Sequence, residues 1–161
     1  MIARYRALSA RIRDEVEDLE RTQQAVQRHW GWAQTATDHQ DAYLNSVALN
    51  LHAFYSGLER VFDLIAVDVD GGRPGSSDWY VELLRQMTLD LGTTRPAVIS
   101  REVWTALDDY RRFRHFIRNI YATNLVPAWM GTLVRDLSPV WKKLRAELEE
   151  FAAFLEAVND S

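Results

Sequence analysis

The sequence predicts an all-α protein, an up-and-down bundle of four long helices with one short additional helix. Apolar residues recur at spacings of three, four and seven over most of the 161 residues, which places them on one face of successive helices. Many of the seven glycines and four prolines lie between residues 71 and 96, so the rest of the chain contains long uninterrupted stretches. Because no alternating strand pattern exceeds a few residues, we expect a single helical domain spanning residues 1–161.

The first helix is predicted from residue 2 to about residue 34, where apolar positions return to one face. Thr37 or Asp38 is expected to cap the second helix, whose apolar face continues to Ile65. Residues 70–77 form the clearest loop of the sequence. A short helix carrying Trp79 is expected to start after this loop, at residue 77 or 78.

Two further helices complete the predicted bundle. Ser100 is a suitable N-cap, with Glu102 in the following turn, for a helix running from about 101 to 123. Pro127 fits the first turn of the last helix, where a missing N–H costs nothing. Pro139 lies inside that helix and is expected to kink or split it near Leu137.

Composition and charge exclude several classes of protein. Nineteen Lys+Arg against 23 Asp+Glu give a net charge of −4, so contact with RNA or DNA requires a local basic cluster. The absence of cysteine removes disulfide frameworks, zinc ribbons and cysteine nucleophiles. The first residues lack the apolar run of a signal peptide, and no stretch of about 18 apolar residues is present. We therefore expect a cytoplasmic protein with no membrane partner.

The usual cofactor and metal motifs are missing. The sequence contains no Walker loop, dinucleotide fingerprint or nucleophile elbow, and its histidines form neither His-Glu-x-x-His nor Glu-x-x-His patterns. No cofactor and no metal site are therefore expected. His52 follows the apolar face of the second helix and is interpreted as a hydrogen-bonding residue at the edge of the core.

Residues 110–121 are the most unusual segment. At 100° per residue, the aromatic and isoleucine side chains of this segment share one arc, which is the expected buried stripe. The other arc carries four arginines, a histidine and an asparagine, whose like charges repel one another. The residues of this arc are Arg111, Arg112, Arg114, His115, Arg118 and Asn119.

Two interpretations of this arginine arc stay open on the residues alone. The first is a solvated helix face balanced by nearby acids such as Asp108, Asp109 and Glu59. The second is a phosphate site, because guanidinium groups bind phosphate oxygens bidentately. In a phosphate site, His115 would supply a titratable group and Asn119 an amide that orients the substrate.

The segment resembles the active-site helix of HEPN-superfamily ribonuclease toxins, in particular the HepT-like proteins. Their pattern is Phe-Arg-Asn, three residues, His, one residue and Tyr. Phe113 and Arg114 match its start, and Tyr121 matches its tyrosine. His115 stands where the family commonly has Asn, and Asn119 stands where the family has His. This variant resembles a subgroup of these proteins.

The resemblance extends over residues 40 to 155. Residues 52–60 are similar to the family's second helix, with an aromatic pair followed by an acid and a base. Further residues resemble the subgroup's middle section, namely Trp79, Leu83, Leu84, Met87, Arg95 and Pro96.

The resemblance implies a toxin-type endoribonuclease of a toxin–antitoxin pair. It implies metal-independent cleavage of RNA phosphodiesters in a cleft between two copies of the chain. It also implies a nucleotidyltransferase-type antitoxin, which in related systems adenylylates the tyrosine that corresponds to Tyr121. Glu59 would then orient Arg114 or Arg118.

Within that framework, Arg114 is expected on an exposed helix face as the transition-state clamp, with Arg111 and Arg118 as phosphate-binding residues. An amide does not titrate near neutral pH, so Asn119 would orient the substrate while His115 transfers the proton. Two alternatives remain. The first is a non-catalytic binding module that holds a nucleotide or docks a nucleotidyltransferase, and the second is a plain interaction bundle.

Overall fold

The computed structural model describes residues 2–118 and 125–158, and these form helices joined by loops. The helices are α1 (Ile2–Thr35), α2 (Gln40–Asp68), α3 (Trp79–Gln86), α4 (Arg101–Arg118) and α5 (Pro127–Val158). No strand occurs among the described residues. The predicted all-α class, with four long helices and one short one, is confirmed.

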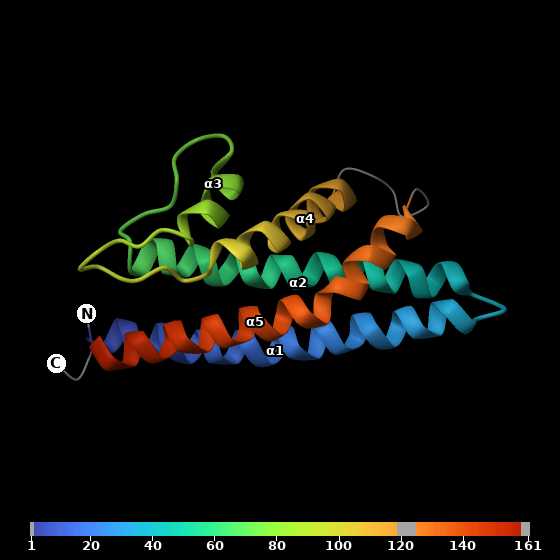
Figure 1. Cartoon of the computed structure of the whole chain (residues 1–161), viewed down its shortest axis with the longest axis horizontal. Coiled ribbons are helices and arrows are strands. Elements are labelled where there is room, and N and C mark those ends of the chain that lie inside the picture. The colour runs from blue at the N-terminus through green and yellow to red at the C-terminus, as the bar shows by residue number, and fades with distance from the viewer. Residues whose placement is uncertain (1, 119–124, 159–161) are drawn as a thin grey trace.

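The long helices alternate in direction along the chain (Figure 1). α1 and α2 form a long antiparallel hairpin, and α5 packs along α1. α3 and α4 lie on the opposite side of α2, which therefore occupies the middle of the bundle. Side chains on the face of α2 that packs against α4 are therefore partly shielded from solvent by α4.

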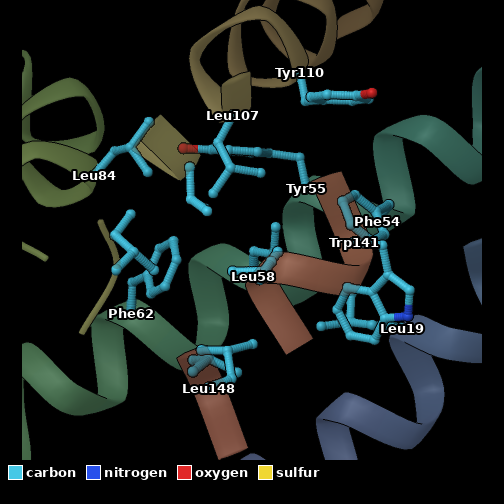
Figure 2. Close-up of a cluster of buried hydrophobic side chains, with 14 of the residues drawn as sticks. Leu19, Phe54, Tyr55, Leu58, Phe62, Leu84, Leu107, Tyr110, Trp141 and Leu148 are labelled. Carbon is cyan, nitrogen blue, oxygen red and sulfur yellow. The ribbon is translucent and has the colours of Figure 1, made fainter. Parts of the chain in front are cut away.

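The core is built around the apolar face of α2 (Figure 2). Phe54 packs against Tyr110 of α4 and Trp141 of α5, with ring centroids 6.1 and 5.8 Å apart. The polar ends of these rings are satisfied, because the Tyr110 hydroxyl donates to the Leu133 carbonyl at 2.6 Å and the Trp141 indole donates to Glu20 at 3.0 Å. Three helices are thus joined through aromatic packing whose buried donors are paired.

Most predicted helix ends are found, with one correction. Ser100 caps α4 by accepting a hydrogen bond from the Val103 N–H at 3.2 Å, and Pro127 opens α5. The predicted cap at Thr37 or Asp38 is wrong, because α2 begins at Gln40. His39 precedes it with a positive φ of 62° and gives no side-chain cap, since the tight turn between the antiparallel helices sets the backbone there.

The other helix boundaries agree with the sequence or refine it. Asp78 precedes α3 without a side-chain cap hydrogen bond. α5 is continuous through Pro139, so the helix is not split, and it changes direction within its orange first half (Figure 1). The segment expected to continue α4 to residue 123 lies outside the described residues after Arg118.

Arg95 joins the loop after α3 to the end of α2. Its side chain is fully buried and pairs with Asp70 through two hydrogen bonds of 2.6 and 2.8 Å. Its remaining donors reach the carbonyls of Leu89, Pro96 and Gln86 at 2.9 to 3.2 Å. All five guanidinium N–H groups are therefore satisfied, and the loop is fixed against α2.

The described helices include none whose length and apolar character would allow it to cross a membrane.

Candidate functional site between α2 and α4

A stripe of polar residues on α2 faces α4. It consists of His52, Ser56 and Glu59, which lie four and three residues apart and therefore share one side of the helix. All three side chains are half-buried. We call this group the α2 polar stripe. Opposite it, α4 carries Arg114 and, one turn further on, Arg118.

Arg114 is buried against the α2 polar stripe. Its Nη1 atom donates to Glu59 Oε1 at 2.8 Å and lies 3.5 Å from Ser56 Oγ. Its guanidinium carbon lies 5.4 Å from the centre of the Tyr55 ring, within the range of a cation–π contact. Only 8% of Arg114 is exposed, so its predicted place on an exposed helix face is wrong. The cause is tertiary, because α2 covers this side of α4 and supplies both a carboxylate and an aromatic face.

Glu59 balances the buried guanidinium with one of its two carboxylate oxygens. Its other oxygen, Oε2, is buried and has no hydrogen-bond partner among the described residues. The contact expected between Glu59 and Arg114 is present. The carboxylate therefore has an unused acceptor next to the guanidinium, which a hydroxyl or amide of a bound molecule could satisfy.

Two other arginines of the arc are paired within α4 itself. Arg111 lies 2.9 Å from Asp108, and Arg112 lies 3.0 Å from Asp108 and 3.6 Å from Asp109. For these residues the structure shows the acid-balanced helix face that the sequence left open. Because the side chain of Arg111 is only 14% exposed, its contact with Asp108 is also partly shielded from water.

Arg118 differs from the other three arginines. It is exposed and forms no ion pair with any acid in residues 2–118 or 125–158. None of the described acids therefore neutralises its charge by direct contact. The sequence placed all four arginines on one exposed arc, whereas the packing of the helices gives them different exposure and different partners.

His115 lies on the side of α4 that faces α3. Its ring stacks on Tyr80, with centroids 6.3 Å apart and planes inclined by 16°. Tyr80 in turn packs edge-on against Trp79. The structure thus brings Arg114 to α2 and His115 to α3. The predicted site residues Asn119 and Tyr121 lie outside the described residues.

His52 supplies the imidazole of the α2 polar stripe, and the sequence predicted it as a hydrogen-bonding residue at the edge of the core. Its pKa is lowered, first by burial and then by the positive charges of Arg114 and Arg118, while Glu59 acts in the opposite direction. His52 is therefore held neutral at neutral pH. The spacing of residues 52, 56 and 59 was the available signal in the sequence. Its meaning becomes clear only once the facing helix is known.

Tyr55 lies beneath the guanidinium of Arg114. Burial raises the pKa of its hydroxyl, and the charge of Glu59 adds to this effect, so the phenol stays protonated at physiological pH. Tyr55 therefore supports Arg114 through its ring and adds no negative charge to the site.

The described residues contain no group of three or more His, Cys, Asp or Glu side chains that could hold a metal ion. The arrangement instead offers guanidinium groups, a neutral imidazole and a carboxylate oxygen. These groups can bind an anion, accept a proton and accept a hydrogen bond.

Comparison with known proteins connects this site to a family. Residues 46–155 match a family model described as HepT-like protein. No curated protein and no solved structure gives a significant match. The matched region begins in α2, includes the α2 polar stripe and all of α4, and ends within α5. Since it covers more than half of the chain, the protein belongs to the HepT-like family of the HEPN superfamily.

Proposed function

We propose that this protein is a toxin-type endoribonuclease that cleaves RNA phosphodiesters without a metal ion. The observation that carries the proposal is the anchoring of Arg114 on Glu59, with the exposed Arg118 one turn further along the helix that bears the family's motif. Fixed guanidinium groups stabilise the charge that develops on phosphorus-bound oxygens in the transition state. Such a site needs no Lewis acid for that purpose.

The active form in this proposal is a homodimer whose two motif helices line one cleft. A nucleotidyltransferase-type antitoxin controls it by modifying Tyr121. Arg114 organises the site from its buried position, while Arg118 makes the first contact with a substrate phosphate. Arg111 would exchange its contact with Asp108 to bind phosphate.

One observation favours a second candidate function, a non-catalytic binding module. Arg111, Arg112 and Arg114 are all paired with carboxylates, which reduces the positive charge available to a transition state. The same helix face would then hold a nucleotide or dock the nucleotidyltransferase. In this alternative Arg118 still contacts the phosphate of the bound molecule, but no bond is cleaved.

The deciding experiment is incubation of purified protein with RNA in EDTA. We expect cleavage to survive chelation. Arg118→Ala should lower the cleavage rate by about 100-fold, because it removes a group that acts mainly on the transition state. Arg112→Ala is the matched control, since Arg112 is exposed on the same helix but already paired with Asp108 and Asp109. Gel electrophoresis of labelled RNA measures both rates.

Three results would count against the proposal in different ways. Cleavage that disappears in EDTA and returns with a divalent ion would overturn the metal-free mechanism. RNA binding without cleavage would favour the binding module. An equal loss in the Arg118 and Arg112 variants would show that general surface charge, and not this site, governs the rate.

Arg114→Ala is expected to abolish cleavage as well, but it is the less informative variant. Removing the guanidinium leaves Glu59 half-buried without its partner, which costs stability as well as activity. Arg118 is exposed, so its removal tests function without disturbing the packing of α2 against α4.

A further inference from the structure

The packing of α2 against α4 fixes which residues face one another. The two helices run in opposite directions (Figure 1), and Arg114 contacts both Ser56 and Glu59. One turn further along α4 is Arg118, and one turn back along α2 is His52. The antiparallel register therefore places His52 opposite Arg118, just as it places Ser56 opposite Arg114.

Among the described residues, the exposure of the interface increases toward this end. Arg114 is buried, whereas Arg118 is exposed and His52 is half-buried, and α4 slopes away from α2 toward its C-terminal end (Figure 1). A phosphodiester bound by Arg118 would thus be next to an imidazole that still contacts solvent. Ser56 and Glu59 lie behind that imidazole on the same stripe.

We infer that His52 of α2, and not His115 of α4, is the group that accepts a proton from an RNA substrate whose phosphate is bound by Arg118. This inference rests on the proposed ribonuclease function and names its general base. His115 stacks on Tyr80 on the α3 side of α4, whereas His52 belongs to the stripe that anchors Arg114. The base and the phosphate-binding arginine then come from two different helices.

The charges around His52 suit this role. The charged groups that act on it are Arg114 and Arg118 of α4 and Glu59 of its own helix. The two arginines and burial favour the neutral imidazole, and the carboxylate opposes them. A general base must be unprotonated before the reaction, and this environment keeps His52 so at neutral pH.

The chemical step balances without any co-reactant. The neutral imidazole takes the proton of the ribose 2′-hydroxyl, and the 2′ oxygen forms a bond to the adjacent phosphorus. The bond from phosphorus to the 5′ oxygen breaks, and its electron pair stays on that oxygen, which takes a proton from water. The imidazolium returns its proton to solvent. The products carry a 2′,3′-cyclic phosphate and a 5′-hydroxyl.

The first test observes His52 itself, independently of cleavage. A pH titration of the full-length protein by NMR, with His52→Gln to assign the signal, should give a pKa below the ordinary histidine value. Arg118→Ala should raise that pKa because a repelling charge is removed, and Arg112→Ala should leave it unchanged. Inorganic phosphate should raise the pKa of His52 in the wild type and not in Arg118→Ala.

The second test measures single-turnover cleavage of RNA against pH. For the wild type the rate should rise with pH, be half-maximal at the pKa found by NMR and level off above it. That pKa should lie on the acid side of the ordinary histidine value of about 6.5. His52→Gln should lower the rate by about 100-fold and remove this dependence. His115→Gln is the control and should keep it. The RNA fragments should carry 5′-hydroxyl ends.

The outcomes separate this inference from the function on which it rests. Cleavage that persists in His52→Gln with an unchanged pH profile overturns the inference and leaves the ribonuclease intact. A wild type that cleaves no RNA overturns both, while the phosphate titration still decides whether Arg118 and His52 share a binding site. A pKa of His52 that responds to neither phosphate nor Arg118→Ala refutes the shared site.

Discussion

The two buried arginines, Arg95 and Arg114, are stabilised in different ways. Arg95 is fully enclosed, and each of its five N–H groups has an acceptor. The hydrogen bonds of Arg114 to described residues involve Nη1 alone, and the guanidinium also lies over the Tyr55 ring. Arg95 therefore has a structural role, whereas the described residues bind only Nη1 of the Arg114 guanidinium.

Removal of the Arg95 partner should be severely destabilising. Asp70→Ala leaves a buried guanidinium without its carboxylate, and loss of one member of a buried pair costs about 3–5 kcal/mol. We expect the free energy of unfolding to fall by that amount. Urea denaturation followed by circular dichroism measures it.

A neighbouring ion pair provides the control for this prediction. Asp63 pairs with Arg73 at 2.9 Å, but the Arg73 side chain is 52% exposed. Asp63→Ala should therefore change stability by less than about 1 kcal/mol, as is usual for exposed pairs. Equal losses of unfolding free energy in the Asp70 and Asp63 variants would show that the burial of Arg95 does not determine how much its ion pair contributes to stability.

At the scale of helices, the contact between α1 and α2 depends on Gly57. A Cβ atom at this position would lie 2.6 Å from Glu15 Oε1 and 3.0 Å from Leu19 Cδ2. The two helices therefore approach each other closely at this point. The absence of a side chain at Gly57 also leaves room for the ion pair between Glu15 and Arg60 at 3.1 Å.

Two alanine substitutions should have opposite effects on stability. Gly31→Ala places its Cβ in open space on α1 and should stabilise the protein by about 0.5–1 kcal/mol through helix propensity. Gly57→Ala gains the same propensity but crowds the buried Leu19, so we expect a net loss of about 1 kcal/mol. Thermal unfolding of both variants tests the comparison. A gain in both would indicate that Leu19 adjusts without strain.

At the scale of the whole molecule, α2 presents an exposed apolar residue beside the candidate site. Leu49 is 67% exposed and lies three residues before His52, on an adjoining side of the helix. An exposed leucine next to a functional stripe fits a surface that a second copy of the chain covers. The dimer of the proposed function would then bury it.

Light scattering at micromolar concentration should therefore show a homodimer. Leu49→Asp should convert it to a monomer, because the new charge would be buried in the interface. Val67→Asp is the control, since Val67 is 45% exposed at the other end of the same helix and should leave the dimer intact. A monomeric wild type would contradict the proposed assembly, and a dimeric Leu49→Asp variant would place the interface on another face.

Helical periodicity and local chemistry were enough to predict most of the fold. The apolar spacing, the loop after Asp70, the cap at Ser100 and the start at Pro127 are all properties of short segments, and the structure confirms them. The family resemblance was also readable, because it depends on the order of residues in short segments between residues 40 and 155. The start of α2 was missed because the antiparallel helices, and not a capping side chain, set the backbone at His39.

The state of each site residue was decided by tertiary structure. The sequence placed Arg114 and Arg118 on one polar face, but only the packing of α2 buries the first and leaves the second exposed. The same packing turns His52 from a residue at the edge of the core into a neighbour of two positive charges. Burial and charge proximity depend on contacts between residues more than 50 positions apart. The order of residues within one helix therefore determined which groups are present, and the facing helix determined what each can do.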